Sequence, residues 1–262
     1  RAASGGRGAR GGSSVALSAG LLASLSPAEL EGLLAHEVAT RRGHRATFMG
    51  RPWPDRGGNG LHVNISFRDK QGHNALYDPK AADGLTELAR QCMAGQLAHH
   101  ASSAAILAPT VNAYKRLRPD MMNGYWGNWG HDDRTVAIRI SPDRGPATRL
   151  ENRVADGAAN PYLAAAALLH MSRLGVEGKM ALPDPQPRGG ETVASSRIPD
   201  NLLAAVEAFE ADANLSGAFG PWFVETWGAI KRAEWQRYVA AVADPSTDQP
   251  TDWELSYYQP FY

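Results

Sequence analysis

A chain of 262 residues, 43% of them hydrophobic, has the length and composition of a globular protein with one substantial core. Its 27 basic and 27 acidic residues cancel, so the overall charge gives no reason to expect a nucleic acid or an anionic membrane as partner. Cys92 is the only cysteine, which rules out a disulfide within the chain and suits a reducing cytoplasm. The longest apolar run, Tyr162 to Leu169, is far shorter than the roughly 20 residues that span a bilayer.

The N-terminal region divides into two parts. Residues 1–13 are rich in glycine and arginine and predict a disordered lead, because glycine is costly to order and nothing apolar is there to bury. Residues 14–38 form an atypical segment in which Ser26 and Glu29 predict the N-cap and the capping-box acid of an amphipathic helix. That helix is expected to end near Gly43.

The same helix contains the run His36-Glu37-Val38-Ala39-Thr40, one residue short of the H-E-x-x-H motif of zinc proteases. Residues 14–39 resemble the segment that leads into this motif in membrane-associated zinc metallopeptidases. Thr40 stands where the second histidine belongs, so a zinc site would lack one of its two imidazoles on this helix face. An active zinc peptidase is therefore not expected, although a zinc ion bound by His36 would revive that alternative.

Alternation of residue types predicts a half-buried strand from Leu61 to Phe67. Polar side chains share one face of this strand, and they are His62, Asn64 and Ser66. The apolar side chains between them are expected to face the core. A lone histidine on such a strand is usually structural, so the pattern alone does not make His62 a metal ligand.

The following helix is expected to have Asp83 as its N-cap and to continue to about Ser103. Cys92 lies on its apolar stripe. Because no local feature would lower the pKa of the thiol, we expect Cys92 to be a packed core residue and not a nucleophile.

Arginines gather between Thr110 and Leu163, and they are Arg116, Arg118, Arg134, Arg139, Arg144, Arg149 and Arg153. Alternation in a strand over residues 149–153 places Arg149 and Arg153 on one side with Glu151. A carboxylate between two guanidinium groups stays ionised, and such a row suits a metal ion and an anionic substrate. In the preceding strand, alternation puts Arg134 and Arg139 on opposite faces unless a bulge intervenes. The alternative is a solvated strand face with salt bridges.

A series of motifs resembles the catalytic domain of the glutamine synthetase family. In chain order they are Ala39–Pro52 (R-x-G-x-x-A-T-F-M-x-K-P), Gly57–Ser66 (N-G-S-G-M-H-x-H-x-S), Asn112–Leu117 (N-x-Y-K-R-L), Asp133–Arg139 (N-R-S-A-x-I-R), Arg149–Arg153 (R-I-E-x-R) and Ala155–Leu163 (P-D-x-x-x-N-P-Y-L). The resemblance covers about residues 37–262. It implies an α+β fold in which antiparallel strands carry the site and helices pack on one side. It also implies a catalytic-type domain over residues 39–262 that is truncated on its N-terminal side, without the family's N-terminal β-grasp domain.

The resemblance implies an ATP-dependent carboxylate–amine ligase. In the family, the γ-carboxylate of glutamate attacks the terminal phosphate of ATP, and an amine then displaces phosphate from the acyl phosphate. The implied cofactors are ATP and Mg²⁺ or Mn²⁺, and the implied substrates are glutamate and either ammonia or an organic amine, giving glutamine or a γ-glutamyl amide. A cytoplasmic location and a homo-oligomeric ring are also implied.

The family's upstream metal-binding glutamates are not recognisable in residues 1–38. We therefore expect the isolated chain to bind ATP and metal weakly and to turn over poorly or not at all. A truncated family member that keeps the fold without activity is the alternative.

The resemblance implies that several residues bind metal ions or the nucleotide. His62 and Glu151 look like ligands of two different metals, and Ser66 is expected near the nucleotide. The expected contacts of the phosphates and the transition state are Arg134, Arg139 and Arg149. Asn64 stands where the family usually has a second histidine.

Other residues are implied to bind the substrate glutamate. Arg116 and Arg153 look like partners of its carboxylates, and Gly58 looks like a backbone contact. Arg116 and Arg134 are the expected catalytic residues. Gly57 stands where the family has an asparagine that helps to hold the substrate.

The aromatic run Tyr125–Trp129 lies where the family has a mobile flap whose glutamate guards the ammonium site. By motif spacing, the place of that glutamate falls at Met122. An apolar thioether should weaken ammonia as the acceptor, because an anionic side chain attracts ammonium and helps to remove its proton. A larger apolar amine is then plausible, with a pocket walled by Met121, Met122, Trp126 and Trp129. The alternative is that these side chains only pack a core loop.

The C-terminal third predicts scaffold helices that begin at Pro161 and extend over residues 200–212 and 221–242. A loop over residues 183–190 separates the first two. Three tryptophans are expected to pack against this scaffold, and they are Trp222, Trp227 and Trp235.

Overall fold

The computed structural model describes residues 38–39, 41–44 and 46–259, and the elements below belong to a unit from Phe48 to Tyr258. Before that unit, residues 38, 39 and 41 are helical, and Gly43 has a positive φ of 74°, which suits the residue after a helix end. The rest of the predicted first helix, including His36 and Glu37, lies outside the described residues. The same is true of the predicted disordered lead.

A four-stranded sheet carries the centre of the unit, and its strands are β1 (Val63–Ile65), β2 (Trp129–His131), β3 (Ile138–Ile140) and β4 (Leu150–Asn152). The spatial order is β1-β4-β3-β2. Strand β4 pairs antiparallel with both β1 and β3, whereas β2 runs parallel to β3. The sheet is therefore mixed, because the chain returns to β3 in the same direction after the loop that follows β2.

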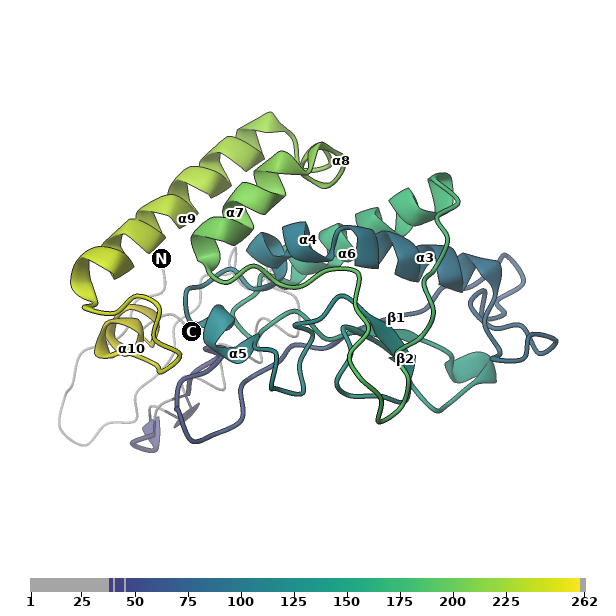
Figure 1. The fold of residues 1–262 in the computed structure, drawn as a ribbon, viewed down its shortest axis with the longest axis horizontal. Coiled ribbons are helices and arrows are strands. Elements are labelled where there is room, and N and C mark those ends of the chain that lie inside the picture. The colour runs from purple at the N-terminus through teal and green to yellow at the C-terminus, as the bar shows by residue number, and fades with distance from the viewer. Residues whose placement is uncertain (1–37, 40, 45, 260–262) are drawn as a thin grey trace. The chain divides into compact units, whose positions relative to one another are not determined.

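Helices cover one side of this sheet, as Figure 1 shows. The longer ones are α3 (Glu87–Ala98), α4 (His100–Leu107), α6 (Pro161–Glu177), α7 (Leu202–Ala211) and α9 (Pro221–Ala241). Short helices are α5 (Ala113–Arg116), α8 (Ala213–Ser216), α10 (Asp252–Tyr258) and the 3-10 turn η1 (Gly145–Ala147). Helix α6 packs on α3 and α4, and α7 packs between α4 and α9. This arrangement confirms the α+β fold class.

Helices α3 and α6 approach closely at Gly95 and Gly175. A Cβ atom on either glycine would collide with the backbone of the other helix. The Gln96 side chain donates to Ser172 on α6 at 3.0 Å and accepts from Asn152 on β4 at 3.0 Å. These buried hydrogen bonds fix the sheet against the helix pair, so β4 has a defined position beneath the helices.

Two details of the predicted helix over residues 83–103 were wrong. The N-cap is Thr86, whose side chain accepts from Ala89 N, whereas the Asp83 side chain accepts from Leu85 N in the preceding turn. The helix also breaks at His99, which divides it into α3 and α4. The prediction for Cys92 is confirmed, because its side chain is buried and burial raises the pKa of the thiol to about 11.

The C-terminal helices agree with the predicted ranges, and Asn160 caps α6 by accepting from Tyr162 N and Leu163 N. Trp227 packs as expected, since its Nε1 donates to Ala105 O at 3.2 Å. Trp222 does not pack within the unit, because 77% of its surface is exposed. It lies in the first turn of α9.

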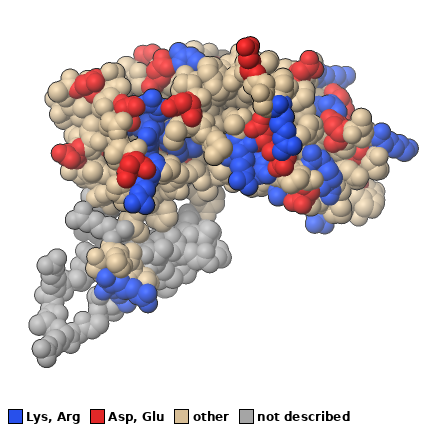
Figure 2. Space-filling view, turned by 60° about the horizontal axis from the view of Figure 1, so that its bottom comes forward, with Lys and Arg blue, Asp and Glu red and all other residues tan. Residues whose placement is uncertain are grey.

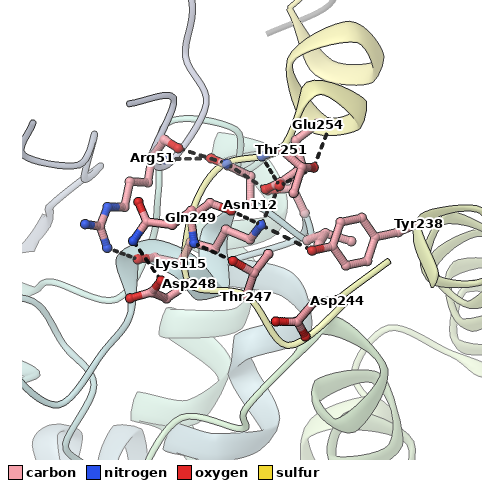
Figure 3. Close-up of polar contacts among 12 residues, drawn as sticks. Arg51, Asn112, Lys115, Tyr238, Asp244, Thr247, Asp248, Gln249, Thr251 and Glu254 are labelled. Carbon is pink, nitrogen blue, oxygen red and sulfur yellow. Dashed lines mark hydrogen bonds and ion pairs between the residues drawn. The ribbon is translucent and has the colours of Figure 1, made fainter. Parts of the chain in front are cut away.

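A buried polar group, here called the Lys115 hub, joins α5 to α10 (Figure 3). Lys115 Nζ donates to Glu254 Oε2 at 2.5 Å, to Gln249 O at 2.5 Å and to Tyr238 OH at 3.2 Å. Asn112 donates to the other carboxylate oxygen of Glu254 at 2.9 Å. Each charge in the hub therefore meets an opposite charge or a dipole, which is the condition for burying charged groups.

No helix among the described residues is long and apolar enough to cross a membrane.

Candidate functional site

A cavity of about 380 Å³ opens at the sheet, and it is lined by His62, Met122, Arg134, Arg139, Glu151 and Arg153. Its centre is Glu151, the middle residue of β4. In the sheet register Glu151 faces Arg139 on β3 and Asn64 on β1, so side chains of adjacent strands converge there. We call this cavity the arginine pocket.

Glu151 is the acid around which the arginine pocket is built. Its Oε2 accepts from Arg139 at 2.9 Å, its Oε1 accepts from Arg153, and His62 Nδ1 lies 3.2 Å from Oε1. Burial raises the pKa of Glu151, but the hydrogen bond from Arg139 and the charge of Arg153 outweigh it and hold the pKa below its ordinary value. The prediction that this carboxylate stays ionised is confirmed.

His62, the residue immediately before β1, lies beside the same charged groups. Burial lowers the pKa of His62, and the charge of Arg153 lowers it further against the opposing effect of Glu151. The imidazole is therefore neutral near pH 7, which is the form that binds a metal ion.

The arginine pocket carries more positive than negative charge. Arg134, Arg139 and Arg153 line it together with one carboxylate, and Asp132 beyond the lining pairs with Arg139 at 2.6 Å. On the face drawn in Figure 2, basic side chains gather in patches with acidic ones between them. An excess of guanidinium groups at a concave site attracts phosphates and carboxylates, which they bind with charge-assisted hydrogen bonds.

Arg134 and Arg139 line the same cavity, although strict alternation had placed them on opposite faces. The reason is that β3 begins only at Ile138, and residues 134–137 form bends. Asp132, with a positive φ of 51°, turns the chain before them. The irregular backbone before β3 therefore has the effect of the bulge that the sequence prediction had allowed for.

Arg149 and Ser66 do not line the arginine pocket. Arg149 precedes β4 and its side chain turns to Asp143 at 3.4 Å and to Ala147 O at 3.1 Å. Alternation had placed it beside Glu151, but β4 begins only at Leu150, after Arg149. Ser66 is exposed just after β1. Their roles toward phosphate and nucleotide stay predictions.

Arg116 lies behind the arginine pocket and not on its wall. It is 4% exposed, and its guanidinium donates to Val154 O. Gly58 covers its aliphatic stem, where a Cβ atom would come within 2.6 Å of Arg116 Cγ. A Cβ on Gly60 would lie 3.4 Å from Arg116 Nη1 and 3.1 Å from His62 Nε2. Only glycine fits at residue 58, where the chain packs against the Arg116 side chain and the Gly50 carbonyl.

A second cavity of about 430 Å³ shares Met122 and Arg134 with the arginine pocket. Met121 and Trp126 also line it, in agreement with their prediction as pocket walls. Trp129 does not line either cavity, because it belongs to β2, is 2% exposed and donates from Nε1 to Pro183 O at 2.7 Å. For Trp129 the alternative of core packing is therefore the right one.

Sequence reasoning missed the contribution of the loop over residues 183–190 to this second cavity. Gln186 and Arg188 line it, although the proline-rich sequence indicated only a connecting loop. The signal that was available is Gln186 itself, an amide among prolines. Its oxygen accepts from Asn128 at 3.1 Å and from Val193 N at 2.8 Å, which holds the loop over the cavity.

The sequence model described as "Glutamine synthetase, catalytic domain" matches residues 32–258. The chain belongs to the glutamine synthetase family. The match begins at residue 32 and so overlaps only the last part of residues 14–39, the segment that resembles zinc metallopeptidases, and it gives that resemblance no support. The domain boundary expected near residue 39 stays a prediction.

Curated relatives and solved structures agree with this assignment. Glutamine synthetase of Methanocaldococcus jannaschii is 36% identical over 84% of this chain and 49% of its own length. The γ-glutamylethanolamide synthetase GlnA4 of Streptomyces coelicolor is 34% identical over 84% of this chain and 45% of its own. A structure of GmaS without ligand superposes with a TM-score of 0.72 at 35% identity, over 87% of this chain and 51% of that one. The chain thus spans about half the length of the relatives it matches, and those relatives are ligases.

Proposed function

We propose that this chain carries the phosphate- and carboxylate-binding half of an ATP-dependent ligase that joins the γ-carboxylate of glutamate to an organic amine. The observation that carries the proposal is the arginine pocket, in which Arg134, Arg139 and Arg153 surround an ionised Glu151 beside a neutral His62. Such a site favours a substrate with several negative charges and a divalent cation together. Membership in the family supports ATP and glutamate as those substrates.

His62 and Glu151 are the residues proposed to hold Mg²⁺ or Mn²⁺. Their side chains lie 3.2 Å apart, so one ion can bind both, whereas the motifs had implied two ions. Residues 38–39, 41–44 and 46–259 contain no group of three or more His, Cys, Asp or Glu side chains placed for a metal. Two protein ligands fit Mg²⁺, which commonly takes one or two carboxylates and completes its octahedron with phosphate oxygens and water. When bound, the ion would neutralise the phosphates of ATP.

The arginines divide the remaining work. Arg134 is exposed at the mouth of the pocket and is proposed to bind the transferred phosphoryl group, with Arg139 behind it. Arg153 is buried beside Glu151 and is proposed to orient a carboxylate of glutamate. The γ-carboxylate oxygen then attacks the terminal phosphorus, the bond to the ADP oxygen breaks, and an acyl phosphate results. Arg116 and Gly58, behind the pocket, are proposed to position the substrate end of this site.

The amine is proposed to approach from the second cavity. Met122 is 70% exposed and lines both cavities, and Trp126 lines the second one. A thioether at this position gives no charge to bind ammonium, but it contacts the alkyl part of an organic amine. Displacement of phosphate from the acyl phosphate by that amine gives a γ-glutamyl amide. The printed name of the relative GlnA4, a γ-glutamylethanolamide synthetase, supports this acceptor class.

We further propose that the isolated chain is a weak catalyst. The family's upstream metal-binding glutamates are not recognisable in residues 1–38, and the matched relatives are about twice as long. A cytoplasmic location and a ring-shaped oligomer remain proposals that follow from the family.

The test is glutamate-dependent release of phosphate from ATP by the purified chain with Mg²⁺ or Mn²⁺, comparing ammonia with ethanolamine, butylamine and benzylamine. Binding of ATP–Mg²⁺ and of glutamate is measured in parallel by calorimetry. We expect weak release that organic amines stimulate more than ammonia, and weaker ATP–Mg²⁺ binding in Arg134→Gln. Stimulation by ammonia alone would overturn the acceptor assignment. A folded chain that binds neither ATP–Mg²⁺ nor glutamate would overturn the proposed function and favour an inactive relative.

A further inference from the structure

A third cavity has a volume of about 480 Å³. It shares no lining residue with the arginine pocket, and one, Pro119, with the second cavity. Its walls come from the segment around α5, from the residues before α7, from α9 and from the loop over residues 244–248 that follows α9. Figure 3 draws part of this loop, with Asp244, Thr247 and Asp248 beside Lys115.

Aromatic side chains form much of the wall of this third cavity. Tyr114 and Tyr125 come from the motif-rich stretch, and Trp235 comes from α9. Tyr114 and Tyr125 are both buried, each with 8% of its surface exposed, and both belong to the lining of this cavity. Ring faces attract cations through their quadrupole, and they also cover the apolar body of a ligand.

The basic groups at this cavity are already neutralised. Lys115 is held by Glu254 in the Lys115 hub, and Arg118 pairs with Asp248 at 2.7 Å. At the rim, Asp200 pairs with Arg197, which lies outside the lining. No free positive charge of the lining is therefore left to attract an anion.

Asp244 is the exception among the acidic groups of the lining. Its Oδ1 accepts from Ser246 N at 3.0 Å and from Ser246 Oγ at 2.5 Å, and these bonds only fold its own loop. In the described part of the chain no ion pair joins Asp244 to a lysine, an arginine or a histidine. Burial lowers the pKa of Lys115 and the charge of Asp244 opposes this from a distance, but Lys115 donates its direct ion pair to Glu254. A carboxylate with no direct ion pair, in the lining of a cavity with aromatic residues, suits an ammonium group.

We propose that this third cavity binds an organic primary amine, with its ammonium group at Asp244 and its apolar body against Trp235 and the two tyrosines. The volume suits a ligand of the size of an arylalkylamine. Lys115 and Leu117 line the cavity on either side of Arg116 in the sequence, so a bound amine touches the segment that positions Arg116. The cavity is thereby an effector site. Its ligand belongs to the same chemical class as the proposed acceptor, but binding of that ligand does not depend on the ligase activity.

The experiment is calorimetric titration of the full chain with benzylamine, in the absence of ATP and glutamate, with benzyl alcohol as the uncharged analogue. We expect benzylamine to bind the wild-type chain. Replacing benzylamine by benzyl alcohol, or Asp244 by Asn, should weaken the affinity by about tenfold, as loss of a charge-assisted hydrogen bond does. Trp235→Leu should weaken binding of both compounds. Asn keeps the turn with Ser246, so Asp244→Asn is expected to fold, and its circular dichroism verifies this.

Met122→Ala separates this cavity from the proposed acceptor site. We expect Met122→Ala to leave the affinity for benzylamine within about twofold, because Met122 lines only the other two cavities. Absence of measurable binding to the wild-type chain would overturn the proposal. Binding that Asp244→Asn leaves unchanged, or that Met122→Ala abolishes, would overturn it as well. None of these results depends on phosphate release, so the proposed function can fail while this inference holds.

Discussion

The arginine pocket and the Lys115 hub are built from the same kinds of charged side chain, but the two groups have opposite roles. Lys115 and Arg116 are neighbours in one motif, yet Lys115 meets one carboxylate in a group whose charges balance. The arginine pocket sets three guanidinium groups against Glu151 and keeps an opening to solvent. Balanced burial costs little once every partner is present, whereas an excess of one sign is unfavourable unless a ligand relieves it. Charge imbalance, and not the mere presence of charge, distinguishes the candidate site from its scaffold.

The largest effect is expected from breaking the balance in the hub. Glu254→Gln keeps the shape of the side chain but leaves Lys115 buried without its carboxylate. Removing one partner of a buried ion pair costs about 3–5 kcal/mol, and we expect a loss of this size in the free energy of unfolding by urea. The exposed residue Glu207 on α7 provides the matched control, since Glu207→Gln should change stability by less than about 0.5 kcal/mol.

A second substitution tests whether charge is the cause. Lys115→Met in the Glu254→Gln background removes the stranded ammonium group, and we expect it to recover part of the lost stability. If the double variant is less stable than Glu254→Gln alone, packing and not charge balance holds the hub together.

Asp156 lies between the hub and the arginine pocket in the size of its expected effect. It is a buried acid near Arg116 whose Oδ2 has no hydrogen-bond partner among the described residues. Burial raises the pKa of Asp156 to about 6, against the opposing charge of Arg116. The folded chain thus favours the protonated acid. A pKa of about 6 in place of 3.8 makes ionised Asp156 destabilising by roughly 3 kcal/mol. This cost is absent below about pH 4, grows up to about pH 6 and is complete above it.

Asp156→Asn should therefore stabilise the chain by up to about 3 kcal/mol at pH 8 and by little at pH 4. The measurement is urea unfolding of both proteins across this range. His100, whose pKa burial lowers to about 4, titrates in the same range but does so in both proteins and cancels from the difference. A stability difference that is constant with pH would show that Asp156 keeps its ordinary pKa in the folded chain.

In the arginine pocket the expected pattern is the reverse, with a loss of ligand binding and little change in stability. Arg134 is exposed, so Arg134→Gln should change the free energy of unfolding by less than about 0.5 kcal/mol. We expect the affinity for ATP–Mg²⁺ to fall about tenfold, which corresponds to one charge-assisted hydrogen bond. A strongly destabilised variant with unchanged ATP affinity would place Arg134 in the scaffold.

Local patterns predicted the centre of this site but not its surroundings. Alternation along β4 correctly joined Glu151 to Arg153, although Arg153 follows the last residue of the strand. It failed for Arg149, whose side chain pairs with Asp143, and for Arg134, which lies in the bends before β3. The buried ion pair of Lys115 was not predictable either, since its partner Glu254 is 139 residues away and only the packing of α10 brings Glu254 close. Motif resemblance supplied roles, while tertiary contacts decided which side chains meet.

Arg149 provides the smallest expected effect and the sharpest comparison with Arg134. The motifs assign both arginines to phosphate, but Arg149 contacts Asp143 and the backbone of Ala147 and does not line the arginine pocket. We expect Arg149→Gln to weaken ATP–Mg²⁺ binding by less than about twofold, because an exposed ion pair contributes little and no pocket contact is lost. The same calorimetric titration measures both variants. An equal loss in the two would mean that Arg149 leaves Asp143 when the nucleotide binds, since its guanidinium must then exchange one carboxylate for a phosphate. Arg149 would then also release its hydrogen bond to Ala147 O in the η1 turn.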